Sequence, residues 1–205
     1  MSTPVTHAVI SEKIFNNFFI DKFKKEFFVG ALFPDIRLIA NIDRNKTHFS
    51  DLNLKGIKSK SPFEIGILIH SFIDINRNEY ILKSGVYELC PKSKFIEASL
   101  KIYEDIIFYQ ELKDWRNIIG YFDNVLEEES LMGISTINIS KWHKTLQEYF
   151  SNEPNIDSIR TFAFNIGYNE SIVENIMNDI ESLKKNKKVD DILRQMFNSF
   201  DLINI

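Results

Sequence analysis

The chain has 205 residues, a length that fits one globular domain, and its 44% hydrophobic and 26% charged residues are ordinary for a globular protein. Its 25 basic and 29 acidic residues give a net charge of −4, which supplies no basic field for nucleic-acid phosphates or anionic lipid surfaces. Seven glycines and five prolines are too few for the turns of a many-stranded β-fold. We therefore expect a single all-α domain over residues 1–205, with no nucleic-acid partner.

Cysteine content and apolar runs bear on the compartment. The single cysteine, Cys90, excludes an intramolecular disulfide and a thiolate metal cluster. The N-terminal residues lack the basic start and the apolar run of a secretory signal. The longest apolar stretch, residues 65–73, is far shorter than the roughly 20 residues needed to span a bilayer. We expect a cytoplasmic protein without a transmembrane segment.

The N-terminal part predicts two helices. Apolar residues recur at helical spacing over residues 4–19, and Pro4 suits the first turn of that helix. A second, shorter helix is expected over residues 22–29. We expect it to stop at Gly30, because glycine commonly ends helices.

The next segment contains two residue types that suit a functional site. Pro34 disfavours helical geometry in the residue before it, so Asp35 is expected at a rigid corner. Residues 41–61 are mostly polar and predict a long loop, which contains His48. Loops of that length in compact domains are usually functional.

The strongest local signal marks the start of a central helix. Ser61 can cap the helix, Pro62 suits its first position, and Glu64 completes a capping box. The helix is expected to run to about residue 82, and apolar residues on every side of residues 63–75 predict that it is buried all round. Apolar spacings of three and four predict further helices over residues 94–112, 114–129, 138–150, 155–165 and 169–200, the last with a break near Asn186.

Histidine and aspartate residues gather in the first 74 positions. Three of the four histidines, His7, His48 and His70, lie there with Asp35 and Asp74. His70 and Asp74 are four residues apart, so they share one face of the central helix. A buried carboxylate needs a cation, a metal or a dense hydrogen-bond network. Each residue alone fits a core or turn position, but the set predicts a metal site for zinc, with ferrous iron or manganese as alternatives.

The roles of other polar residues have more than one interpretation. Gly66 is expected to open space beside the site. Arg77 is interpreted either as a phosphate-binding residue or as a surface arginine. Glu104 and Asp105 either add a carboxylate ligand or, as we expect, lie exposed on the polar side of their helix. His143 lies among apolar positions and is expected to be a core or boundary residue.

Four short segments resemble the zinc-dependent phospholipase C family in order and rough spacing. They read Thr6-His7-Ala8, Gly30-Ala31-Leu32-Phe33-Pro34-Asp35, Thr47-His48-Phe49 and Gly66-Ile67-Leu68-Ile69-His70-Ser71-Phe72-Ile73-Asp74. The resemblance covers about residues 3–80. It implies that one zinc ion is bound by Asp35, His48, His70 and Asp74. It further implies that Asp74 bridges to a second zinc ion held by His7, and that Asp35 serves as the general base.

The chain also departs from that family. The family's third metal uses a later His, His, Glu set, but no histidine lies between Asp74 and His143. The tryptophan at the N-terminus of the family's secreted members has no counterpart. The chain therefore resembles the smaller intracellular relatives, which implies one or two metal ions. The expected function is a zinc-dependent phosphoric diester hydrolase that uses a metal-activated water, with a small-molecule or lipid phosphoester as substrate.

Two alternative readings remain open. The first is another helical metallohydrolase. An HD-type phosphohydrolase would need an adjacent His-Asp pair, which is absent, and an acyl-carrier-protein phosphodiesterase would explain His70 and Asp74 but not His48. The second is a non-catalytic helical interaction module in which four protein ligands enclose a structural metal, leaving no position for water.

Overall fold

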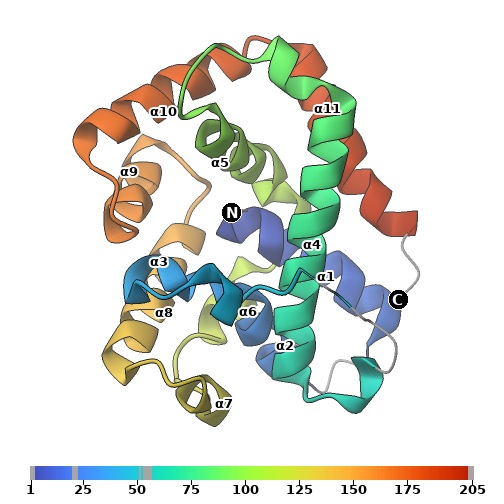
Figure 1. Cartoon of the computed structure of the whole chain (residues 1–205), viewed down its shortest axis with the longest axis vertical. Coiled ribbons are helices and arrows are strands. Elements are labelled where there is room, and N and C mark those ends of the chain that lie inside the picture. Colours follow the sequence, from blue (N-terminus) through green and yellow to red (C-terminus); the bar gives the residue numbers. More distant parts are fainter. Residues whose placement is uncertain (1–2, 20–22, 51, 53–56, 203–205) are drawn as a thin grey trace.

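The computed structural model describes residues 3–19, 23–50, 52 and 57–202, and within these ranges it contains helices and no strand (Figure 1). The predicted all-α class is confirmed. No helix in the described part of the chain is both long and apolar enough to cross a membrane. The helices are α1 (Pro4–Phe18), α2 (Lys24–Leu32), α3 (Arg37–Ala40), α4 (Pro62–Ser84), α5 (Ile96–Phe108), α6 (Trp115–Gly120), α7 (Glu127–Leu131), α8 (Thr136–Phe150), α9 (Ile156–Asn165), α10 (Glu170–Leu183) and α11 (Lys187–Ser199).

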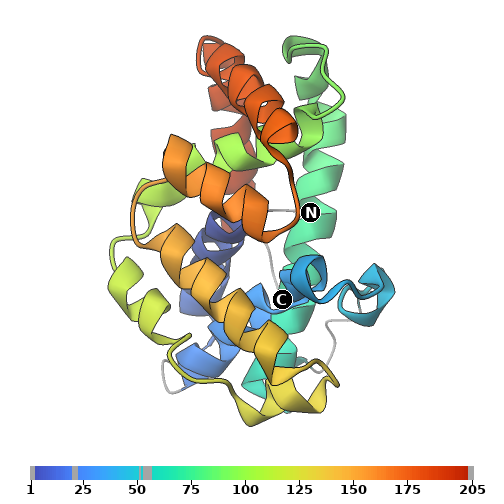
Figure 2. The same ribbon diagram turned by 90° about the vertical axis from the view of Figure 1, so that its left-hand side faces the viewer.

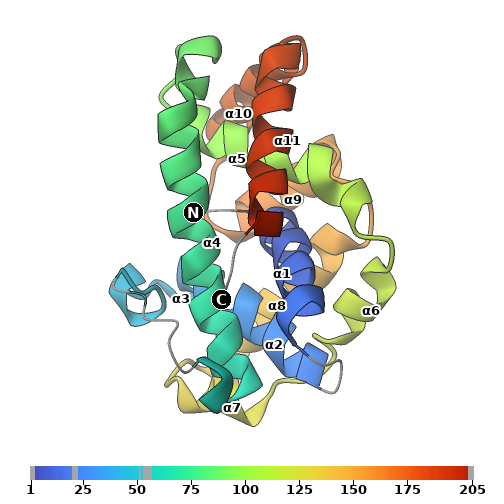
Figure 3. The same ribbon diagram turned by 90° about the vertical axis from the view of Figure 1, so that its right-hand side faces the viewer.

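Helix α4 is the central element, and it begins as the sequence predicts. The Ser61 hydroxyl accepts from the Glu64 backbone amide at 3.2 Å, and the Glu64 carboxylate accepts from the Ser61 amide at 2.9 Å. The helix ends at Gly85, whose φ of 67° is easily adopted by glycine. Helix α4 runs along the long axis of the molecule, and α11 lies beside its upper half (Figures 1 and 3).

Two glycines allow α2 and α4 to cross in backbone contact. A Cβ added at Gly30 would lie 2.1 Å from the Phe63 carbonyl oxygen, and one added at Gly66 would lie 2.2 Å from the Phe27 carbonyl oxygen. Both distances are far below van der Waals contact. Two predictions are therefore wrong: α2 continues through Gly30 to Leu32, and Gly66 leaves no space beside the site because the α2 backbone fills it.

The helices after α4 pack on one another and on the N-terminal helices. Helix α5 packs on α1 and on α10, while α8 lies next to α9 on the left-hand face of the molecule (Figure 2). The Trp142 indole of α8 donates to the Leu32 carbonyl at 2.9 Å and so ties α8 to the end of α2. The predicted break near Asn186 is confirmed, since Asn186 caps α11. The helix predicted over 114–129 is wrong, because α6 and α7 are separate short helices.

Candidate metal centre

Helix α4, two turns and the start of α1 bring the five predicted ligands together. His70 and Asp74 lie one turn apart on α4, and His7 lies in the first turns of α1. Asp35 lies in the 3-10 turn η2 (Pro34–Ile36), where Pro34 occupies the first position, and His48 follows the turn η3 (Arg44–Lys46). All five side chains are buried, with at most 6% of the residue exposed. Five side chains from between positions 7 and 74 of the chain are therefore close together in the interior.

The distances inside the cluster are short. Nε2 of His70 lies 3.0 Å from Nε2 of His48, and the His7 ring stacks on the His70 ring with a centroid distance of 3.8 Å. Nε2 of His48 lies 3.6 Å from Oδ1 of Asp35 and 3.7 Å from Oδ2 of Asp74. Nε2 of His7 lies 3.4 Å from Oδ1 of Asp74. Donor atoms of all five residues thus face a common space.

Backbone contacts fix which ring nitrogens face that space. Nδ1 of His70 lies 2.8 Å from the Ala31 carbonyl oxygen, which can only accept, so Nδ1 carries the proton and Nε2 carries a lone pair. Nδ1 of His48 lies 2.9 Å from the Thr47 hydroxyl, which is 3.4 Å from the Arg44 carbonyl. If the hydroxyl donates to that carbonyl, Nδ1 of His48 donates to the hydroxyl and both Nε2 atoms carry lone pairs. Histidine ligands to metals commonly donate their other N–H in this way.

Two members of the cluster have polar atoms without a hydrogen bond. These atoms are the two ring nitrogens of His7 and Oδ1 of Asp35. All three are buried, and none makes a hydrogen bond within the described residues. A buried polar atom left unsatisfied costs about 1–3 kcal/mol. These atoms and the lone pair on Nε2 of His70 fit a metal ion, because one cation would satisfy nitrogen and oxygen ligands at once. The residues present could therefore hold a metal ion.

The protonation states also suit a cation. Burial and the neighbouring His7 lower the pKa of His70 to about 3, so its ring is neutral at neutral pH. Burial raises the pKa of Asp35, but interactions with His48 and His70 outweigh it and hold the pKa below its ordinary value. The pKa of Asp74 is lowered in the same way, against burial, by His7 and His70. Two buried carboxylates are thus ionised, which is the ligand form.

The potential metal ligands divide into two overlapping groups that share His70. One comprises His7, His70 and Asp74, the other Asp35, His48 and His70, and within each group the donor atoms lie within 4.8 Å of one another. His70 can bind only one ion at a time, through Nε2, because its Nδ1 donates to the Ala31 carbonyl. Asp74 turns one oxygen toward His7 and the other toward His48. Its carboxylate is therefore the group suited to bridge two ions.

Asp105 positions the start of α1, and the sequence did not assign it this role. Its carboxylate accepts from the Thr6 backbone amide at 2.7 Å, the Thr6 hydroxyl at 2.8 Å and the Val5 amide at 3.3 Å. These bonds satisfy amides at the helix N-terminus, where a negative charge is favourable. Burial raises the pKa of Asp105 to about 6, although the hydrogen bonds lower it in part. Asp105 thereby fixes the turn that carries His7.

Arg44 is a second residue that the sequence did not single out. One of its terminal nitrogens lies 2.5 Å from Oδ2 of Asp74, and its side chain is 42% exposed. It stands at the edge of a pocket of about 270 Å³ that also borders His48, Asp74, Asn45 and Asn78. The Phe49 backbone amide, which donates to the Ser71 hydroxyl at 3.0 Å, holds this loop against α4. The cluster is therefore reached from a polar pocket with a cation at its edge.

Four other candidates lie outside the cluster. Arg77 is fully buried and pairs with Glu104 through two nitrogens, so the structure does not bring it together with the metal ligands and supports neither a phosphate contact nor a surface position. The expectation that Glu104 and Asp105 are exposed is wrong, since both are 0% exposed. His143 is buried as expected and lies 2.7 Å from Glu129. These groups serve the packing of the helices.

Comparisons of the chain with protein-family models, with curated proteins and with solved structures found no match. Function is therefore inferred from the geometry of the cluster and its pockets.

Proposed function

We propose that this protein is a metal-dependent hydrolase of phosphate esters, most simply of phosphodiesters, with zinc as the metal. One observation carries the proposal: a buried His-His-His-Asp-Asp cluster, whose potential metal-binding atoms lie close together, borders a pocket that is lined mainly by polar residues and includes an arginine. The motif resemblance to the zinc-dependent phospholipase C family supports it. The general reaction class follows from donors of this kind combined with access from solvent.

The chain's own residues have separable tasks in this proposal. The metal, when bound, supplies Lewis acidity and makes a water molecule acidic enough to attack at neutral pH. Arg44 binds a phosphate oxygen, because its guanidinium is partly exposed and its planar donors match phosphate geometry. Asp35 is ionised at neutral pH, and a carboxylate oxygen of this residue accepts the proton of the attacking water. His70 is held in its ligand tautomer by the Ala31 carbonyl.

A structural metal site is the competing function. It would have no open position for water or substrate. The pocket that borders His48 and Asp74 favours the catalytic reading, because a ligand of small size can approach both residues from it.

The test is a hydrolysis assay on the intact chain reconstituted with zinc. We expect turnover of a chromogenic phosphodiester, such as bis(p-nitrophenyl) phosphate, with a rate that increases on the basic side of the pH profile. His70→Ala and Asp35→Asn should lose the activity. Glu79→Gln is the matched control, because Glu79 lies on the exposed side of the same helix α4, where it pairs with Lys83 at the surface. Stoichiometric zinc without hydrolysis of any ester tested would favour the structural site.

A further inference from the structure

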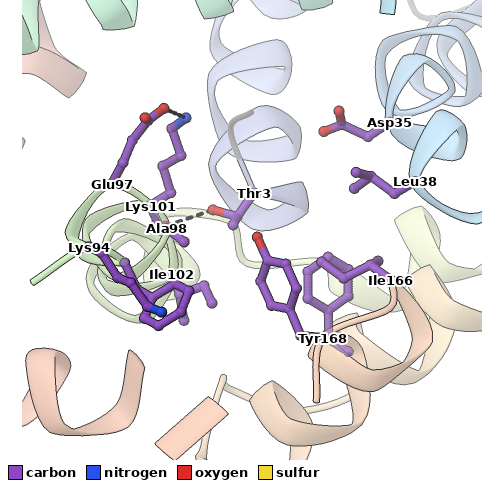
Figure 4. Close-up of a pocket in the computed structure, with 12 residues that line it drawn as sticks. Thr3, Asp35, Leu38, Lys94, Glu97, Ala98, Lys101, Ile102, Ile166 and Tyr168 are labelled. Carbon is purple, nitrogen blue, oxygen red and sulfur yellow. Dashed lines mark hydrogen bonds and ion pairs between the residues drawn. The ribbon is translucent and has the colours of Figure 1, made fainter. Parts of the chain in front are cut away.

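A second pocket borders the cluster from the side of Asp35. It has a volume of about 250 Å³ and lies between α5, the turn after α9, and the segment that carries Asp35 (Figure 4). It shares no lining residue with the pocket at Arg44. The cluster is thus bordered by two different pockets, and Asp35 is the cluster residue that lines this one.

The walls of this pocket are mainly apolar. Ile102, Ile166 and Phe162 contribute aliphatic and aromatic surface, and further apolar surface comes from Leu38, Phe95 and Ala98. In Figure 4, Ile102 and Ile166 lie on opposite sides of the pocket, and Asp35 lies on the same side as Ile166, beyond Leu38. The pocket therefore combines apolar walls with one carboxylate of the metal cluster.

Several polar groups of the wall interact with other groups of the protein, while Tyr168 adds a hydroxyl to the lining (Figure 4). Nζ of Lys101 lies 2.5 Å from a carboxylate oxygen of Glu97, so these two charges neutralise each other. The Thr3 hydroxyl donates to the Lys101 carbonyl at 2.7 Å. Lys94 lies over the Phe95 ring, with Nζ 4.8 Å from the ring centroid. A sugar, a polyol or a charged headgroup would lose its hydration here and gain few hydrogen bonds in return.

We propose that this pocket binds the organic group of the substrate, and that this group is compact and apolar, a short alkyl chain or a single aromatic ring. The inference rests on the proposed function, because it places the phosphorus beside Asp35 and the metal ligands. The volume sets the size: a water molecule's share of the liquid is about 30 Å³, so the pocket has room for about eight groups of that size.

Binding of n-alkylphosphonates to the zinc-reconstituted chain tests this inference by calorimetry, without any need for turnover. The series runs from methyl through propyl to pentyl. Each buried methylene group should strengthen binding by about fourfold. In Ala98→Phe, the new ring fills the pocket, so methylphosphonate should bind as before and the dependence on chain length should disappear. Ile166→Asn, which makes the wall polar without filling it, should weaken the same dependence.

Leu131→Phe is the control, because Leu131 is 78% exposed on α7 and an added ring there leaves the pocket unchanged. Equal affinities along the series in the wild-type chain would overturn the inference, and so would an unchanged dependence on chain length in both pocket variants. The two proposals fail separately. Hydrolysis without any dependence on chain length overturns the pocket assignment alone. A dependence on chain length in a protein that hydrolyses no ester supports the pocket and overturns the proposed function.

Discussion

Replacing Gly66 with alanine should force α2 and α4 apart at the point where the metal centre is built. The added Cβ would lie 2.2 Å from the Phe27 carbonyl oxygen and 2.5 Å from the Ala31 amide nitrogen, whereas ordinary contact begins at 3.4 Å. The α2 backbone must therefore retreat by about 1.2 Å, the difference between 3.4 and 2.2 Å. Overpacking usually costs about 1–3 kcal/mol, and here the obstacle is backbone that cannot rotate away. We expect a loss of at least about 3 kcal/mol in unfolding free energy.

The measurement is urea unfolding of the metal-free chain, followed by far-UV circular dichroism, with the slope of the transition compared between variants. Gly120→Ala is the matched control. The nearest atom to a Cβ at Gly120 is a carboxylate oxygen at 3.9 Å, so this substitution should be neutral or stabilise by up to about 1 kcal/mol. Gly66→Ala should also weaken zinc binding, because moving Ala31 moves the carbonyl that orients His70. A Gly66→Ala protein as stable as the wild type would refute the close crossing of the two helices.

Three further predictions concern single side chains of the site. In the wild type, the pKa of Asp105 is about 6 in the folded state and 3.8 in the unfolded state, so the unfolding free energy should fall by about 3 kcal/mol as the pH rises from about 4 to 6. Asp105→Asn should remove this pH dependence. Chemical denaturation of both proteins across that range measures the difference, and parallel curves would contradict it. Asp74→Asn should weaken zinc binding more than His7→Ala, because Asp74 faces both donor groups; a competitive chelator titration that ranks them in reverse would exclude bridging by Asp74. Arg44→Ala should bind zinc at least as tightly as the wild type, because a cation next to Asp74 is lost, yet bind inorganic phosphate more weakly; unchanged phosphate affinity by calorimetry would remove Arg44 from the substrate site.

Local signals in the sequence predicted much of the helical framework. The Ser61-Pro62 start of α4 follows from capping chemistry that needs only neighbouring residues, and the structure contains that capping box. The pairing of His70 with Asp74 follows equally from helical spacing. The prediction that α2 stops at Gly30 is wrong, because a glycine that ends a helix and a glycine that allows another backbone to approach look the same in a sequence. Only the position of α4 distinguishes the two cases.

The missed residues act over long distances along the chain. Arg44 reaches Asp74 across 30 positions from a loop that has no periodic pattern, so nothing in the sequence indicated that the two charges meet. Asp105 binds Thr6 across 99 positions. A signal existed in that case, because Asp105 interrupts an apolar stretch, and a buried carboxylate there requires donors. The sequence could not show that the donors are the first amides of the helix that carries His7.

Metal stoichiometry is the direct test of the metal centre. The intact chain is stripped with a chelator, reconstituted with a modest excess of zinc, desalted and analysed for metal by mass spectrometry. We expect at least one equivalent of tightly bound zinc in the wild type and in Glu79→Gln, and its loss when His70→Ala and Asp74→Asn are combined. Less than about a tenth of an equivalent in the folded wild-type chain would contradict the metal centre.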